Sequence, residues 1–346
     1  MEVSNSLRFF VGTYTDSLSK GIESISLDTA TGQLSSHPAL LNTSNPSYLH
    51  LTKNGLYSFN EVEEAEGCEL IFLNKQQTHY IDINGDYPCH LDSDSSESLL
   101  AVANYGSGNV SVYQLDSEGK PFYLIANLFN EGCGPNLQRQ TSPHAHQVKF
   151  LRQSSELWVV DLGADRVYIY GYADSQFELC QSIELPGGAG PRHLVLNKNE
   201  DIAYIVCELS ETLVTLKKQA NEWCIEHECD LLNDSEKGEA AAAIKLSSCE
   251  QFLYVSCRHQ NRIVLFDVKS GQPERIHDID CGGAFPRDFT ISSDGKWLVV
   301  ANQHSNNIVS FQRDEQSGMF KPTGFEIEIG SPVCILESNT KDTQAS

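Results

Sequence analysis

A chain of 346 residues that holds 24 Lys and Arg against 47 Asp and Glu has a formal net charge of −23 at pH 7. Such a charge opposes binding of nucleic acid or of an anionic membrane surface. Residues 1–7 are polar and no run of 18 apolar residues occurs, so neither a signal peptide nor a membrane span is expected. We therefore expect a cytoplasmic protein without nucleic acid or membrane partners.

The eleven cysteines are odd in number and form no C-x-x-C pair. Cys207 and Cys257 lie inside apolar runs, which favours free buried thiols in a reducing compartment over a disulfide framework. Cys224, His227 and Cys229 are close in sequence, but no second pair with the spacing of a zinc site accompanies them. We therefore expect neither a metal nor another cofactor.

One pattern recurs along the chain: an alternating run near a proline, a polar turn, and a second run rich in Val, Tyr and Leu. The copies begin at Asn45, Tyr87, Ser142, Gly190, Glu239 and Phe285. A third alternating run follows several of them, as in GNVSVYQL and NRIVLFDV. Alternation with period two between turn signals predicts antiparallel strands.

Prolines set the register of the repeat. They are Pro46, Pro88, Pro143, Pro191, Pro286 and Pro332, with Ala241 in the place of a missing one. The successive gaps are 42 to 55 residues, a period that indicates the blades of a β-propeller.

The two ends of the chain complete a seventh copy. FFVGTYT from Phe9 matches a second strand, and SPVCIL from Ser331 matches a first strand. Joining them in one blade closes the ring and removes exposed strand edges. We predict one all-β domain over residues 1–346, with seven blades of four antiparallel strands and a flexible tail at 337–346.

Because the innermost strand of each blade lines the central channel, equivalent positions should form rings around one axis. The residue after each register position gives a first ring of Ser47, Cys89, His144, Arg192, Ala242, Arg287 and Val333. The polar pair that closes each second strand gives another ring of Tyr14, Glu61, Tyr105, Leu162, Glu208, Arg258 and Gln303. Antiparallel pairing should place both rings at the same mouth.

The rings are rich in charge and imidazole. His144, Arg192, Glu208, Arg258 and Arg287 belong to them, and His146, His193, His259 and His304 lie nearby. These side chains could simply satisfy loop carbonyls and one another. In so acidic a chain, however, converging arginines favour an anion-binding pocket, since the guanidinium fork suits carboxylate and phosphate. His144 could activate water, an arginine could hold an oxyanion, and Glu208 could orient a histidine or be the base itself.

At PHAH, GPRH, CELS, CRHQN and FPRDF the sequence resembles the bacterial propeller-type 6-phosphogluconolactonases, from about Phe9 to Ile335. The resemblance implies metal-independent hydrolysis of a sugar lactone in the pentose phosphate pathway. Fungal carboxymuconate-lactonising enzymes resemble the same fold, and their His, Arg, Glu, Arg set falls on His144, Arg192, Glu208 and Arg258. The chain departs from the family at Cys207 and Cys257, where asparagine is usual, and at AAAI in place of a register proline.

The longest gap precedes His144, and its loop contains Arg139. Arg139 is either a phosphate ligand or a solvated surface residue. Arg287 lies outside the set shared with enzymes of unphosphorylated substrates, so we assign it to the substrate phosphate ahead of Arg139. The predicted substrate-binding residues are Arg287, Arg139, His146, His193, His259, Tyr14, Tyr105 and Gln303.

Two other functions stay open. One is a lactonising or delactonising enzyme for a dicarboxylate such as carboxymuconate, because arginines bind carboxylate and phosphate alike. The other is a non-enzymatic propeller that binds proteins, which would lack ordered arginines in its pocket. A metal-dependent sugar lactonase would need carboxylates and an asparagine on the axis, where this ring is basic. The oligomeric state stays open between a monomer and a weak dimer.

Overall fold

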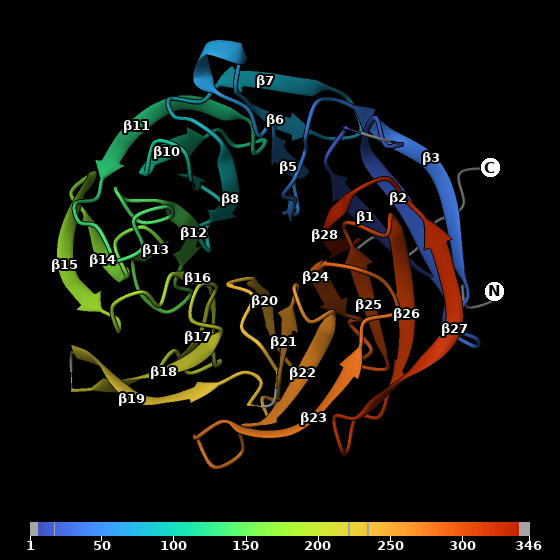
Figure 1. Ribbon diagram of the computed structural model, residues 1–346. Helices are drawn as coiled ribbons and strands as arrows, with labels where there is room; N and C mark the ends of the chain where they lie inside the picture. Colours follow the sequence, from blue (N-terminus) through green and yellow to red (C-terminus); the bar gives the residue numbers. More distant parts are fainter. Residues whose placement is uncertain (1–5, 17, 221, 234, 339–346) are drawn as a thin grey trace.

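The computed structural model describes residues 6–338 except 17, 221 and 234. Within these ranges the chain forms seven four-stranded antiparallel sheets arranged as a ring around one axis (Figure 1). The only helical segment among the described residues is the short 3-10 turn η1 (Glu64–Glu66). The predicted seven-bladed all-β propeller is therefore confirmed.

Each blade is ordered from the channel outward. The first four are β28 (Pro332–Glu337), β1 (Ser6–Thr13), β2 (Gly21–Asp28), β3 (Leu34–Asn42); β4 (His50–Leu51), β5 (Leu56–Phe59), β6 (Glu69–Leu73), β7 (Thr78–Asp82); β8 (Pro88–Ser93), β9 (Leu99–Asn104), β10 (Asn109–Leu115), β11 (Pro121–Phe129); and β12 (Ala145–Phe150), β13 (Glu156–Asp161), β14 (Arg166–Ala173), β15 (Gln176–Glu184). The other three are β16 (Pro191–Leu196), β17 (Ile202–Cys207), β18 (Thr212–Gln219), β19 (Glu222–Asp230); β20 (Ala241–Leu246), β21 (Phe252–Cys257), β22 (Arg262–Asp267), β23 (Glu274–Asp280); and β24 (Pro286–Ile291), β25 (Trp297–Asn302), β26 (Asn307–Arg313), β27 (Phe320–Glu328).

The hydrophobic core lies between neighbouring blades. The alternating strands put Val, Ile, Leu and Phe on the sheet faces, where they are excluded from solvent. Between two of the blades, Trp158 of β13 meets Trp223 of β19 edge to face, with ring centroids 4.7 Å apart. Burying both faces of every sheet makes the blades depend on one another, as expected for a closed repeat.

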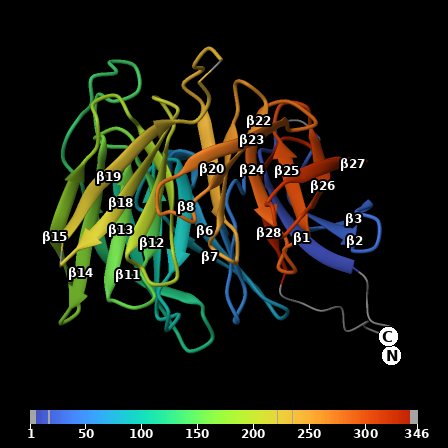
Figure 2. The same ribbon diagram turned by 90° about the horizontal axis from the view of Figure 1, so that it is seen from below.

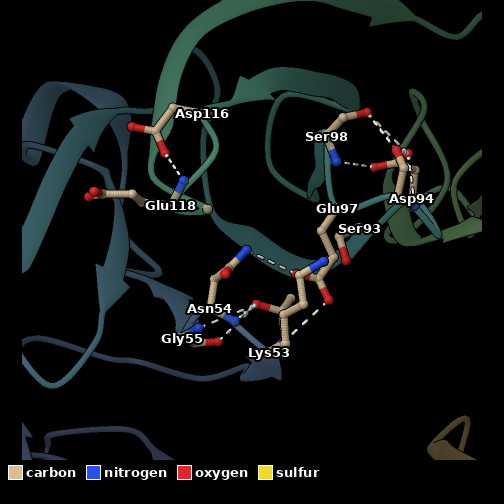
Figure 3. Close-up of polar contacts among 12 residues, drawn as sticks. Lys53, Asn54, Gly55, Ser93, Asp94, Glu97, Ser98, Asp116 and Glu118 are labelled. Carbon is tan, nitrogen blue, oxygen red and sulfur yellow. Dashed lines mark hydrogen bonds and ion pairs between the residues drawn. The ribbon is translucent and has the colours of Figure 1, made fainter.

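Polar contacts also join blades at the face opposite the mouth, where inner strands turn into second strands. Figure 3 shows the turn between β4 and β5 beside the turn between β8 and β9. Asn54 Nδ2 donates to Glu97 Oε2 at 3.1 Å, and Lys53 Nζ lies 3.6 Å from the same oxygen. Because Lys53 is largely exposed, this ion pair adds little stability.

The ring closes where the sequence predicted. β1 pairs with β28 in the antiparallel register Phe9↔Glu337 and Val11↔Ile335. The expected tail at 337–346 was too long, because Glu337 is still paired in β28 and Ser338 N donates to Arg8 O at 2.8 Å. Residues 339–346 lie outside the described ranges.

Deleting residues 331–346 should therefore leave a protein that aggregates. The deletion removes β28 and exposes the unpaired edge of β1. Size-exclusion chromatography and thermal unfolding would test this, with deletion of 339–346 alone as the matched control. A 331–346 deletion that stays monomeric and melts at the temperature of the full chain would contradict closure by β28.

Two further expectations bear on the whole chain. All eleven cysteines are free thiols; Cys207 and Cys257 are buried, as their apolar runs predicted, whereas Cys133, Cys180 and Cys249 are exposed. In the described part of the chain, no helix has both the length and the apolar character needed to cross a bilayer.

Candidate active site

Irregular pairing at the start of the inner strands builds the mouth. In β16 the pairing passes from Pro191↔Cys207 to His193↔Val206, which leaves Arg192 as an extra residue. Such a bulge redirects side chains and is common beside active sites. Arg192 and His193 consequently both line the axial cavity.

The structure corrects the alignment of one blade. β12 begins at Ala145, and its irregularity leaves His146, rather than His144, at the position of Arg192. His144 O accepts from Leu162 N, as Gly190 O accepts from Glu208 N, so His144 precedes the register position. Pro143 was thus the wrong register residue. A slip of two residues keeps the same strand face, so alternation could not reveal it.

A small cavity lies on the axis beneath the mouth. It is lined by Ser47, Tyr48, Glu61, Cys89, His146, Arg192, His193, Arg287, Asp288 and Val333. Its volume is about 20 Å³, enough for about one water molecule. Six of these residues belong to the first ring, so the ring prediction located this cavity once His146 replaces His144.

Glu208 follows β17 directly and is the centre of a cluster of three arginines, the Glu208 cluster. Its Oε1 lies 2.7 Å from Arg139 Nη2, and its Oε2 lies 2.9 Å from Arg192 Nε and 2.8 Å from Arg258 Nη2. Burial opposes ionisation of this carboxyl, but Arg258 and Arg192 outweigh it and hold the pKa of Glu208 well below its usual range. A carboxylate stabilised in this way is a poor base, so Glu208 is better suited to positioning guanidinium groups.

Backbone carbonyls at the start of β20 also contact this cluster. Arg258 Nε donates to Ala240 O at 2.9 Å, and Arg192 Nη1 donates to Ala242 O at 3.0 Å. Burial lowers the pKa of Arg258 to about 10, which still leaves it charged at neutral pH. These carbonyls thus accept hydrogen bonds from guanidinium N–H groups of Arg192 and Arg258 that do not contact Glu208.

Arg287 is part of a second chain of contacts on the same mouth. Its Nη2 donates to the Tyr14 hydroxyl at 2.8 Å, and that hydroxyl donates to Glu61 Oε1 at 2.9 Å. The guanidinium also lies 5.2 Å from the centre of the Tyr14 ring. Burial raises the pKa of Tyr14, so the phenol stays neutral and links Arg287 to Glu61.

His144 is held in one orientation beside the Glu208 cluster. Its Nδ1 lies 2.7 Å from Tyr105 O, and its ring stacks on Tyr105 with centroids 4.6 Å apart. Because a carbonyl only accepts, Nδ1 carries the proton and Nε2 keeps a lone pair. Tyr105 in turn accepts a hydrogen bond from Arg139 at 3.2 Å. A Cβ at Gly163 would lie 2.8 Å from His144 Cδ2, so this approach requires glycine.

An aromatic stack lies against Arg258 of the Glu208 cluster. The guanidinium of Arg258 lies 5.0 Å from the centre of the Phe285 ring, and His304 stacks on Phe285 at 3.9 Å. Phe285 has φ 65°, and Tyr87 and Ser331, which also precede register prolines, have φ 48° and 41°, so this conformation belongs to the repeat. Sequence reasoning missed Phe285, although it stands directly before Pro286.

The predicted site residues differ in where they lie. Tyr105 and Arg139 join the Glu208 cluster, and Tyr14 joins Arg287. His259 is exposed against Gly238 and is neither in the cluster nor in the cavity lining. Gln303 is partly buried, and its backbone N donates to Phe285 O at 3.0 Å, the bond equivalent to that of Glu208 N with Gly190 O, so it occupies the predicted ring position but is not in the cavity lining.

Two cavity residues, Tyr48 and Asp288, were not predicted. They follow ring residues directly, and a strict alternation turns every second side chain away from the channel. For Asp288, the irregular pairing between Pro286 and Asp288, which sequence periodicity does not report, brings the side chain to the axis. Among the described residues, no three His, Cys, Asp or Glu side chains are grouped so as to hold a metal ion.

Loops rise above the mouth. Figure 2 shows the green segment between β11 and β12 and the yellow segment between β19 and β20 extending from the same face of the disc. The first carries Arg139, and its Asn136 Nδ2 reaches Glu239 Oε2 at 3.4 Å. The long loop predicted beside the mouth therefore contacts the segment that precedes β20.

Known proteins share this architecture and sequence. The family described as "Lactonase, 7-bladed beta-propeller" matches residues 8–337. A 6-phosphogluconolactonase of Bacillus subtilis is 31% identical over 94% of this chain and 97% of its own length. A crystal structure of a putative 6-phosphogluconolactonase from Bacteroides fragilis is 25% identical, covers 98% of this chain and 99% of its own, and has a TM-score of 0.89. The periplasmic gluconolactonase of Pseudomonas aeruginosa is 28% identical, covers 96% and 99%, and has a TM-score of 0.87. The chain therefore belongs to the lactonase family of seven-bladed β-propellers.

Proposed function

We propose that the chain hydrolyses 6-phosphogluconolactone to 6-phosphogluconate at the mouth of the propeller. The observation that carries the proposal is local charge. Arg139, Arg192, Arg258, Arg287 and Lys245 against Glu208, Glu61 and Asp288 give 5 − 3 = +2, in a chain whose net charge is −23. A positive pocket in so acidic a protein favours an anionic substrate. The name of the Bacillus subtilis relative supports the phosphorylated lactone.

In this proposal His144 is the general base. Its Nε2 takes a proton from water while the water oxygen forms a bond to the lactone carbonyl carbon. One guanidinium stabilises the negative charge that develops on the carbonyl oxygen. Collapse of this intermediate breaks the bond to the ring oxygen, which receives the proton from His144. The carboxylic acid product then ionises and releases one proton to solvent.

No step in this mechanism uses a metal, and no cofactor takes part. We also propose a cytoplasmic location, because all eleven thiols are free and a reducing compartment preserves them. The Pseudomonas aeruginosa relative is periplasmic, so family membership alone does not decide the compartment.

A lactonase assay tests the proposal. Initial rates with freshly generated 6-phosphogluconolactone and with unphosphorylated gluconolactone are compared after subtraction of spontaneous hydrolysis. We expect kcat/KM to be roughly 10–100-fold higher for the phosphorylated lactone, because charge-assisted hydrogen bonds contribute about 1.5–3 kcal/mol each. EDTA should leave the rate unchanged.

Two results would contradict this proposal. Equal kcat/KM for both lactones would show that the site does not recognise the phosphate. Loss of activity with EDTA and its return with calcium or zinc would show that a metal ion, rather than His144, activates the water. The His144→Gln variant, purified in the same way, is the control for contaminating lactonases.

A further inference from the structure

Charge is unevenly distributed over the pocket. In the Glu208 cluster three guanidinium groups contact one carboxylate, which leaves 3 − 1 = +2. On the other side, Arg287 is linked through Tyr14 to Glu61, and the cavity residue Asp288 pairs with Lys245 at 3.3 Å, which leaves 2 − 2 = 0. The net positive charge of the pocket therefore lies in one place.

The three arginines of the Glu208 cluster differ in exposure. The Arg139 side chain is 37% exposed, whereas those of Arg192 and Arg258 are 4% and 7% exposed. Arg139 comes from the loop above the mouth, so an anion entering from solvent meets it first. Arg287 and Glu61 line the axial cavity, which they share with Arg192 of the Glu208 cluster. A substrate that reaches both sides would have its charged end near Arg139.

We propose that this pocket selects a lactone with a single, doubly charged phosphate bound on the Arg139 side, and that Glu61 excludes a second anionic group from the Arg287 side. This inference rests on the proposed function and names its substrate class. A phosphate monoester carries about −1.5 to −2 charges in one group, which matches a +2 cluster. A dicarboxylate lactone would instead put one carboxylate beside Glu61. The proposal replaces the sequence-based assignment of the phosphate to Arg287.

The same arrangement assists product release. The lactone carbonyl is neutral before hydrolysis, whereas the product has a carboxylate at that carbon. With the phosphate at Arg139, this new carboxylate lies toward Glu61, and two like charges about 10 Å apart or closer repel appreciably in a partly buried site. Glu61 therefore discriminates against the product in favour of the substrate.

The test compares two ligands that differ at one carbon. 6-Phosphogluconate carries a carboxylate where glucitol 6-phosphate carries a neutral hydroxymethyl group. Calorimetry gives the Kd of each for the unmodified chain and for Glu61→Gln, whose amide oxygen can still accept from Tyr14. We expect Glu61→Gln to bind 6-phosphogluconate about tenfold more tightly, the effect of removing one repulsive charge. Its Kd for glucitol 6-phosphate should change less than about twofold.

Two arginine variants place the phosphate. Arg139→Gln should weaken both ligands by a similar factor, roughly 10–100-fold, because both carry the phosphate. Arg287→Gln should change the Kd of glucitol 6-phosphate much less. Thermal unfolding of each variant controls for misfolding. Tyr14→Phe removes the hydroxyl that links Glu61 to Arg287, so the Kd values of the two ligands are also compared for this variant.

Several outcomes overturn the inference. A Glu61→Gln variant that changes both Kd values equally, or neither, removes the charge filter. If Arg287→Gln weakens glucitol 6-phosphate while Arg139→Gln does not, the phosphate lies at Arg287. If the unmodified chain binds neither phosphate ligand, the proposed function itself fails, which separates that failure from failure of the charge filter alone.

Discussion

Replacing His144 by glutamine is expected to lower kcat by roughly 10²–10⁴, the usual effect of removing general acid–base assistance. The structure makes His144 suitable because its Nδ1 donates to Tyr105 O at 2.7 Å, which leaves the Nε2 lone pair for the proton of water. The base acts mainly in the transition state, so KM should change little. Initial rates over a range of 6-phosphogluconolactone concentrations separate the two constants.

His146→Gln is the informative comparison for this experiment. The two histidines are two residues apart, but His146 lies on the axial ring with its Nδ1 4.0 Å from Cys89 Sγ. Burial lowers the pKa of His146 well below its usual value, and Arg192 adds to the effect. We expect His146→Gln to change KM more than kcat. A larger loss of kcat in His146→Gln than in His144→Gln would move the base into the axial ring.

The second large effect is expected on stability as the pH falls below about 6.5. His90, His146 and His193 pack against one another along the axis, with ring centroids 5.3 and 5.2 Å apart. Burial lowers the pKa of all three well below the usual value. Below pH 6.5 the unfolded chain binds three protons that the folded chain excludes. The free energy of unfolding should therefore fall with pH by as much as about 4 kcal/mol per pH unit.

Urea unfolding at pH 8, 7, 6 and 5.5 measures this slope. The contribution of these histidines to stability is fully present above the pKa that they have in the unfolded chain. It is lost as the pH falls below that pKa. Protonation of carboxylates would weaken the repulsion between negative charges in this acidic chain and so oppose the effect of the histidines. Few carboxylates are protonated above pH 5, so this opposing effect is small in the range measured. Removing one histidine as His90→Gln should reduce the slope by about one third. A free energy of unfolding that is flat from pH 8 to 5.5 would show that these imidazoles are protonated in the folded protein.

Sequence by itself determined the blade count, the closure and most of the mouth. Alternation and turns are local signals, so the repeat predicted seven sheets and the shared terminal blade. Arg192, Glu208 and Arg258 were placed together because equivalent positions of a ring must meet at one axis. This inference needs only the register, and the contacts of Glu208 with both arginines agree with it.

The tertiary structure decided what the repeat does not encode. Arg139 reaches Glu208 from a loop with no equivalent in other blades, so its path depends on the packing of the whole mouth. Arg287 meets Tyr14 across 273 residues, through a blade built from both ends of the chain. His144 and His146 exchange places when the register slips by two residues, and hydrophobic alternation is unchanged by such a slip. Backbone pairing at Ala145, where a bulge directs His146 to the axis, resolves that ambiguity because it depends on where the hydrogen bonds of β12 and β13 begin.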